Sequence, residues 1–284
     1  MVNHRLYHHG YVPILMDVQN DRGQFNHAVE TLLERRIDGL ITVAMANFLY
    51  LGPDPLRPLV EGGIPMVSAG RRVTAPASSI FTDYEAGTYC ALEHLYTLGH
   101  REVAFIKGPK ALLDTEQRWN GICSFAKSAH LELDPGLIVQ IHGRNSSYSE
   151  AWELTEDLLR RQRHFTALVA FDEITAFGAI SALSNAGVQV PQECSVVGFD
   201  DIPEAAFYNP PLTTVSQALG LQGSLSVEVL IQLVRTVGQK KKLDPVYRSV
   251  PPKLVVRKTT MAPNLATLAS VGKGTPRGSI VRGA

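Results

Sequence analysis

The sequence predicts an α/β fold of two lobes, each built on a parallel β-sheet that is covered by helices. Short apolar runs rich in β-branched residues alternate with amphipathic stretches, which is typical of parallel sheets with helices on both faces. A length of 284 residues suits about two domains of roughly 150 residues. The rhythm of the chain changes near Pro210-Pro211. A second lobe explains this change better than one long sheet of about eight strands.

The first part of the chain predicts the elements of one lobe. They are, in order, the end of a helix at 3–9, a strand at 11–16, a helix at 24–36, and strands at 39–44, 64–68 and 80–82. A helix that leads into a parallel strand normally follows another strand. The chain is therefore expected to begin in the middle of a βαβ unit.

The middle of the chain repeats strand and helix regularly. The expected strands are 103–106, 137–141, 167–171 and 195–198, and the expected helices are 85–98, 115–130, 149–161 and 173–185. Gly99 and Gly187 stand where helices are expected to stop. Beyond them the pattern predicts a strand at 212–217, a long helix at 221–237, and a strand-like stretch at 246–256 that Pro251-Pro252 interrupts. Residues 265–284 lack sustained periodicity and predict a flexible tail.

Composition excludes several classes of protein. Lys+Arg and Asp+Glu both number 27, so the net charge is +0 and the chain lacks the basic surplus expected of a protein that grips DNA by itself. No run approaches 18 apolar residues, and the start lacks the apolar core of a signal peptide, so no membrane association is expected. Three widely spaced cysteines suit a reducing compartment. We expect a cytoplasmic protein.

No enzyme signature is present. The sequence lacks G-x-S-x-G, H-E-x-x-H, and a G-x-G-x-x-G that follows a strand. His4, His8 and His9 have a spacing that could hold a metal, but a solvated helix end is the simpler interpretation. The glycines of 272–275 suggest a phosphate loop, yet no Ser or Thr directly follows Lys273. The sequence therefore predicts no enzyme, no cofactor and no metal site.

Two carboxylates follow apolar strands and are candidates for ligand binding. Asp172 comes directly after ALVAF, and Asp200 comes after SVVGF. Ligands of open α/β sheets bind just outside the carboxyl ends of the strands, where a carboxylate can accept hydrogen bonds from hydroxyls or amines. Asp172 is equally well explained as a helix N-cap, and one residue can do both. Arg118, one turn into a predicted helix, is by itself most simply a surface arginine.

Five segments carry a resemblance to a known family. They are GHREVAFIKGP (99–109), QRWNGICSF (117–125), LVAFDEITAFGAISAL (168–183), SVVGFDDIPEAAFYNPPLTTVSQ (195–217) and RKTTMAPN (257–264). Together, and in this order, they resemble the LacI/GalR family of bacterial transcription regulators, and the last is similar to the end of the lactose-repressor core. The resemblance covers residues 2–264.

The resemblance implies two flavodoxin-like lobes with a ligand cleft between them. The chain would cross between the lobes near Thr82, Pro211 and Lys240. Residues 1–82 with 212–240 would then form the first lobe, and 83–211 with 241–264 the second. Family members form homodimers and read operator DNA through an N-terminal helix-turn-helix domain, which is absent from this sequence together with the first strand of the first lobe. The chain is thus expected to be an N-terminally truncated repressor.

The resemblance also implies a set of ligand contacts. Arg118 and Asp172 fall where the family places a ligand-binding arginine and carboxylate, and Asp200 has a similar position to that of Asp172. Asn145 lies near the position of a stacking aromatic residue, in a loop that is one residue longer, so that Tyr148 or Trp152 is an alternative.

Arg71 matches an arginine of the sugar binders, although Gly70 stands where those proteins carry an acidic residue. An Asp with an Arg would chelate vicinal sugar hydroxyls through charge-assisted bonds. A sugar is the first expectation for the small-molecule effector, and purines, sugar phosphates and acids remain open. The predicted function is the effector-binding core of a regulator that controls operator binding. A solute-binding protein for uptake, with the same fold, is the alternative.

Overall fold

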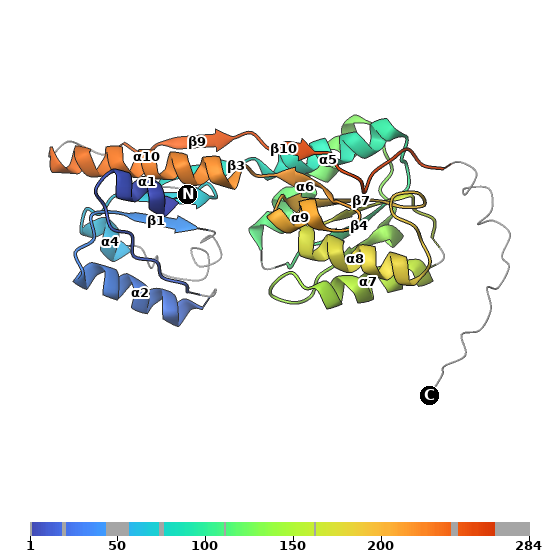
Figure 1. The fold of residues 1–284 in the computed structure, drawn as a ribbon, viewed down its shortest axis with the longest axis horizontal. Coiled ribbons are helices and arrows are strands. Elements are labelled where there is room, and N and C mark those ends of the chain that lie inside the picture. The colour runs from blue at the N-terminus through green and yellow to red at the C-terminus, as the bar shows by residue number, and fades with distance from the viewer. Residues whose placement is uncertain are drawn as a thin grey trace.

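A computed structural model describes residues 2–18, 21–43, 57–73, 77–110, 112–161, 163–239 and 244–264. Figure 1 shows two lobes side by side, with the chain passing between them along one edge of the molecule. The predicted tail and the Lys240–Lys242 run lie outside the described residues. No helix of the described part is long and apolar enough to cross a membrane.

The first lobe is built on a four-stranded parallel sheet in the order β1-β2-β3-β9. Its strands are β1 (Leu40–Val43), β2 (Met66–Gly70), β3 (Ser78–Thr82) and β9 (Tyr247–Val250). Its helices are α1 (Val2–His8), α2 (Arg22–Glu34), α4 (Arg57–Glu61) and α10 (Leu219–Gly238). Asp21 caps α2 by accepting a hydrogen bond from Gln24 N at 2.8 Å, which explains why the helix begins two residues before its predicted start.

Two small apolar clusters hold this lobe together, one on each face of the sheet. Phe25, Val29 and Leu59 of α2 and α4 pack with Met66 on one face. On the other face, α10 packs over Val67, Ile80 and Val250, so that the long helix and the last strand stabilise the same sheet.

The second lobe is built on a six-stranded sheet in the order β10-β8-β7-β6-β4-β5. All neighbours are parallel except β10 and β8. Its strands are β4 (Val103–Lys107), β5 (Ile138–Gln140), β6 (Ala167–Ala170), β7 (Ser195–Asp200), β8 (Thr213–Ser216) and β10 (Lys253–Val255). Its helices are α5 (Tyr84–Leu98), α6 (Leu113–Ser128), α7 (Tyr148–Arg160), α8 (Glu173–Asn185) and α9 (Pro203–Phe207), with a 3₁₀ turn η1 (Pro135–Leu137).

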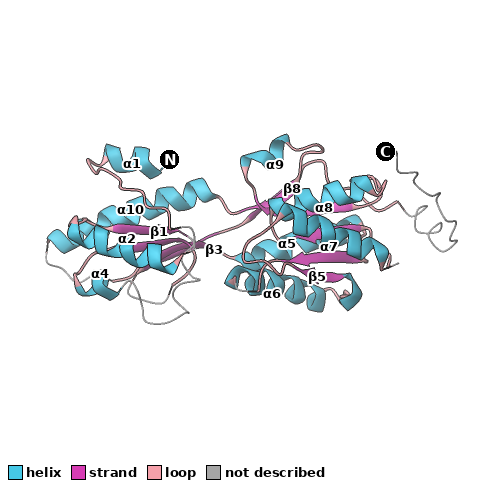
Figure 2. Cartoon of the chain, turned by 90° about the horizontal axis from the view of Figure 1, so that it is seen from below, coloured by secondary structure: helices cyan, strands magenta, loops and turns pink. Residues whose placement is uncertain are grey.

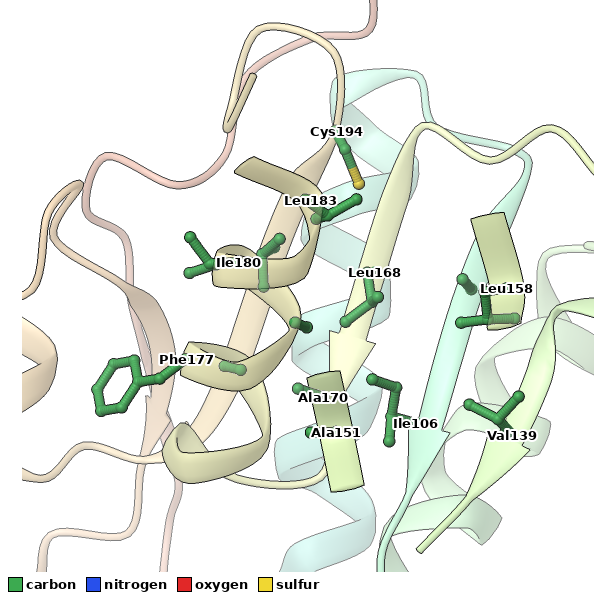
Figure 3. Close-up of a cluster of buried hydrophobic side chains, with 14 of the residues drawn as sticks. Ile106, Val139, Ala151, Leu158, Leu168, Ala170, Phe177, Ile180, Leu183 and Cys194 are labelled. Carbon is green, nitrogen blue, oxygen red and sulfur yellow. The ribbon is translucent and has the colours of Figure 1, made fainter. Parts of the chain in front are cut away.

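Both faces of this sheet carry a large core. α7 and α8 cover one face, where Leu168 and Ile106 meet Leu158 and Leu183 (Figure 3). α5 and α6 cover the other face, around Phe105. The helices lie very close together: a Cβ placed on Gly178 of α8 would stand 2.3 Å from Tyr148 O of α7.

The predicted two-lobe α/β fold with parallel sheets is confirmed, and most predicted elements are present within a few residues of their expected limits. One strand is wrong. Residues 11–16 were expected to be a strand, yet they belong to no strand of the described part. No strand of the described part pairs with them, and Pro13 has no N–H to donate to a ladder.

Two lobe boundaries also differ from the prediction. The strand at 212–217 was expected in the first lobe, but β8 pairs with β7 in the second, so the chain crosses between β8 and α10. The last crossing was expected near Lys240, but β9 still pairs with β3. The chain crosses instead at Pro251-Pro252, where two missing N–H groups interrupt any ladder and separate β9 from β10.

Candidate functional site

Arg118 is a buried arginine, not a surface one. It projects from the second turn of α6 and is only 6% exposed. Its Nη2 donates to Asp200 Oδ1 at 2.9 Å and its Nη1 donates to the carbonyl of Phe171. The guanidinium lies 3.9 Å from the centroid of the Phe199 ring and 4.4 Å from that of Phe171. Its Nε has no hydrogen-bond partner within the described part of the chain. The aromatic rings and the carboxylate thus hold this cation rigidly.

Asp200 stands at the end of β7 with φ at 113°, a left-handed conformation that non-glycine residues rarely adopt. Arg118 and Gln217 Nε2 both donate to its Oδ1, which joins β7 to the residues after β8. Burial raises the pKa of Asp200 above its usual range, although Arg118 acts in the opposite direction. Backbone strain that is held by side-chain bonds is typical of functional sites.

Asp172 serves as the N-cap of α8, as one of its two interpretations predicts. Its Oδ1 accepts from Thr175 N at 2.9 Å and from Thr175 Oγ1 at 2.7 Å. Its Oδ2 accepts from Ser146 Oγ of the loop before α7. Asp172 is therefore held in place at the carboxyl end of β6, next to Phe171, whose carbonyl accepts from Arg118.

The buried carboxyl group of Glu173 supports the turn at Asp200-Asp201. Glu173 was not among the predicted residues. It is 1% exposed, and its Oε1 accepts from Asp201 N at 2.7 Å and from Thr214 Oγ1 at 2.5 Å. Burial raises the pKa of Glu173 to about 8, and the neighbouring Asp200 acts in the same direction. Glu173 thereby fixes the Asp200-Asp201 turn against β8.

Arg71 joins the two lobes. It follows β2 of the first lobe, is 8% exposed, and forms an ion pair through Nη2 with Asp114 of α6 in the second lobe. Its Nη1 has no hydrogen-bond partner among the residues described. Tyr84 Oη, from α5, donates to Gly70 O at 3.1 Å across the same boundary. Arg71 and Arg118 are thus placed on the facing sides of the two lobes.

Asn145 is the predicted residue that the structure does not join to this network. It is exposed in the loop before α7, and no hydrogen bond between described residues connects its side chain to Arg118 or Asp172. The neighbouring Ser146 makes the contact with Asp172 instead. Tyr148 and Trp152, the suggested stacking alternatives, lie with ring centroids 6.4 Å apart on the first turns of α7.

Three cavities of the described part differ in size, and the smallest of them is lined by Arg118. The cavity that Arg118 lines holds about 20 Å³, which suits a single water molecule. Larger hollows of about 700 Å³ and 600 Å³ lie between the end of α8 and Tyr208, and beside β1. A sugar bound by Arg118 and Arg71 would therefore lie between the lobes and not in a closed pocket of either.

Comparison with known proteins identifies the family. A model of the periplasmic binding protein-like domain matches residues 92–260. The chain belongs to this family, as an effector-binding core of the LacI/GalR type. The HTH-type transcriptional repressor PurR of Haemophilus influenzae (strain PittEE) is 29% identical over 262 residues, which are 91% of this chain and 75% of that protein. Such repressors are not enzymes, so the prediction of no enzyme is confirmed.

Solved structures agree with this identification. A dimeric Lac repressor with an 11-residue C-terminal deletion has a TM-score of 0.77 at 26% identity, over 93% of this chain and 92% of that one. The complex of the transcriptional regulator CelR with cellobiose has a TM-score of 0.76 at 25% identity, over 91% and 76% of the two chains. The resemblance seen in the sequence segments is therefore confirmed.

Besides Glu173, sequence reasoning missed three further residues of the network, namely Asp114, Tyr84 and Gln217. Asp114 stands four residues before Arg118 on one helix face, a spacing that could have identified it. Tyr84 and Gln217 flank two lobe crossings, and no local pattern marks either residue as part of the site.

Proposed function

We propose that this chain binds a small polyhydroxylated molecule, a sugar or sugar derivative, between its lobes and thereby controls operator binding. The observation that carries the proposal is the Arg118–Asp200–Asp172 cluster at the strand ends of the second lobe, which faces Arg71 of the first lobe, the partner of Asp114 on α6. Three carboxylates and two arginines offer both acceptors and donors, as vicinal hydroxyls require. A phosphate or a simple acid would meet an excess of negative charge. The solved CelR–cellobiose complex supports a sugar.

The mechanism would be a shift between lobe arrangements. A ligand that contacts Arg118 and Asp172 in one lobe and Arg71 in the other binds best when the lobes are close together. It therefore favours that arrangement by its difference in affinity. Operator DNA would be contacted through a helix-turn-helix domain, not by the residues described here, and the protein would act in the cytoplasm.

A homodimer is part of this proposal. Phe207, at the end of α9, is 87% exposed and would be removed from water at an interface between two copies of the chain. The dimeric Lac repressor neighbour supports the same assembly. Sedimentation equilibrium should give about twice the chain mass of 31.0 kDa, and Phe207→Ser should lower that value toward the monomer.

The ligand site is tested by calorimetric titration with a panel of mono- and disaccharides, nucleobases and sugar phosphates. We expect at least one neutral sugar to bind, and Asp172→Asn and Arg118→Lys to weaken that binding by about tenfold or more. Asp172→Asn removes the negative charge of one contact, and Arg118→Lys replaces a planar fork of donors by a single ammonium group. Asp134→Asn is the matched control, because Asp134 pairs with Arg163 on the surface of the same lobe. Binding that the two site variants leave unchanged would refute the site.

A further inference from the structure

The described chain passes between the lobes three times, and Thr82 lies where these crossings meet. The first crossing follows β3, which ends at Thr82. The second joins β8 to α10 through Gln217 and Ala218. The third is Pro251-Pro252, directly after Val250, which lies opposite Thr82 in the ladder of β3 and β9. Figure 1 shows β3, α10 and β9 together along the edge where the lobes join. A rotation of one lobe against the other therefore has to turn the chain at this point.

Three buried residues, Thr82, Gln217 and Gln222, bond the first two crossings to each other and are here called the hinge cluster. Thr82 Oγ1 donates to Gln217 O at 3.0 Å. Gln222 Nε2 donates to Thr82 Oγ1 at 2.8 Å and to Gln217 O at 2.6 Å. Their exposed fractions are 3%, 6% and 2% respectively, so a lost bond would leave a buried polar group without a partner.

The bonds of the hinge cluster cross the lobe boundary. Thr82 and Gln222 belong to β3 and α10 of the first lobe, whereas Gln217 directly follows the last residue of β8 in the second. Both bonds that end at Gln217 O thus join one lobe to the other. The next residue, Ala218, has φ 50° and ψ 45°, a left-handed conformation that non-glycine residues rarely adopt. Such strain persists where the surrounding bonds fix it, so the hinge cluster holds a strained turn in place.

Gln217 also connects the hinge cluster to the candidate ligand site. Its Nε2 donates to Asp200 Oδ1, while its main-chain carbonyl accepts from Thr82 and Gln222. Asp200 lies opposite Ser216 in the ladder of β7 and β8, so the carboxylate and the second crossing are neighbours in the backbone as well. One residue therefore contacts both a candidate ligand-binding carboxylate and the point about which the lobes turn.

We propose that the hinge cluster is a conformational device that restrains the turning of the lobes, and that Gln217 transmits a change at Asp200 to it. A ligand that donates to Asp200 competes with Gln217 for the same carboxylate and thereby loosens the hinge cluster. This use of the device rests on the proposed function, whereas the device itself is a property of the chain without ligand.

The test is amide hydrogen exchange of the full chain without ligand at pH 7, read by mass spectrometry over residues 80–84 and 218–223. Thr82→Val removes the hydroxyl at nearly constant shape and should make exchange at 218–223 about fivefold faster. Gln222→Met removes the amide and should accelerate exchange at 80–84 by a similar factor. Thr236→Val and Gln232→Met are the matched controls, because these two residues bond to each other within α10, away from the crossings. Neither control should change exchange in either segment.

Two further variants test the link to Asp200. Gln217→Met keeps the main-chain carbonyl but removes the side-chain donor, and Asp200→Asn removes the charge of the acceptor. Both should accelerate exchange at 80–84, in the other lobe. Asp172→Asn is the matched control, because Asp172 bonds to Thr175 and Ser146 instead. Residues 167–170 of β6 serve as the reference for the stability of the second lobe.

The outcomes separate the two parts of the proposal. Unchanged exchange at 80–84 in Gln222→Met and at 218–223 in Thr82→Val overturns the hinge cluster. Unchanged exchange at 80–84 in both Gln217→Met and Asp200→Asn overturns the link. Acceleration that is equally large at 167–170 reports a general loss of stability and overturns the proposal too. Because no ligand is used, a failure of the sugar titration would leave these results unaffected.

Discussion

The two lobes share one architecture but enclose their sheets to very different degrees. In the second lobe β6 is buried along its whole length and both faces of the sheet carry a large apolar core. In the first lobe Leu40 and Ile41 of β1 are only partly buried, and the clusters on the two faces are small. The comparison predicts that the first lobe, with its smaller apolar clusters and partly buried β1, is the less stable of the two.

The prediction with the largest expected effect tests directly whether the two lobes differ in stability. Leu168 and Ile80 are both 0% exposed, one in each lobe. We expect scanning calorimetry to resolve two transitions, with the first lobe unfolding at the lower temperature. Leu168→Ala should destabilise the second lobe by about 2–5 kcal/mol and shift the upper transition, whereas Ile80→Ala should shift the lower one. A single transition that both variants shift alike would contradict the comparison.

The next effect concerns the buried cation of the second lobe. Arg118→Met leaves Asp200 without its charged partner, with only the hydrogen bond from Gln217 among the described contacts, and should cost about 3 kcal/mol of unfolding free energy. Adding Asp200→Asn removes the uncompensated charge, so the double variant should be more stable than the sum of the single effects. Both tryptophans, Trp119 and Trp152, lie in this lobe, so urea unfolding followed by tryptophan fluorescence reports on it alone. Additive effects would mean that the two side chains do not act together.

The second lobe was also the more predictable one. Helix 173–185 was predicted with its observed limits because Asp172 provides a local cap and Gly187 a local stop, at φ 78°. The strand at 11–16 was predicted wrongly because a strand depends on its neighbours: the apolar pattern is present, but none of the described strands pairs with these residues. The lobe boundaries were predicted wrongly for a similar reason, since the sequence of β8 or β9 does not show with which strand it pairs.

The residues of the candidate site also differ in how far the sequence alone could locate them. Asp172 and Asp200 could be located because the ends of parallel strands meet at one edge of a sheet. The Arg71–Asp114 pair could not be located in this way. The two residues are 43 positions apart in the sequence, and their contact depends on how the two lobes face each other. Glu173 could have been noticed as a charged residue in an apolar helix, but its bonds to Asp201 and Thr214 are contacts over long distances in the sequence.

A smaller effect is expected in the pH dependence of the unfolding free energy of the second lobe. Burial raises the pKa of Glu173 to about 8 from 4.5, so the folded second lobe keeps a proton that the unfolded chain releases. Its unfolding free energy should therefore fall as pH rises from about 4.5 to 8, by at most about 1.4 kcal/mol per pH unit from this group. Glu173→Gln should reduce that slope in urea unfolding followed by tryptophan fluorescence. Glu204→Gln, on the exposed face of α9, should leave it unchanged. Equal slopes in all three proteins would show that Glu173 is ionised at neutral pH.

The smallest effect on stability should have the largest effect on shape. Asp114→Asn removes the charge that pairs with Arg71 across the lobe boundary. Separation of the lobes would return Arg71 to water, so the loss of unfolding free energy should be below about 1 kcal/mol, as for a solvated pair. The two lobes lie side by side (Figure 2), and the Arg71–Asp114 pair is one of the described bonds between them. We therefore expect small-angle X-ray scattering to report a larger radius of gyration for Asp114→Asn at low salt. Asp134→Asn, which breaks a pair within one lobe, should leave the radius unchanged. If both variants keep the wild-type radius, the hydrogen bonds from Tyr84 to Gly70 and from Thr82 to Gln217 suffice to hold the lobes together. The Arg71–Asp114 pair would then not be needed to keep the lobes close.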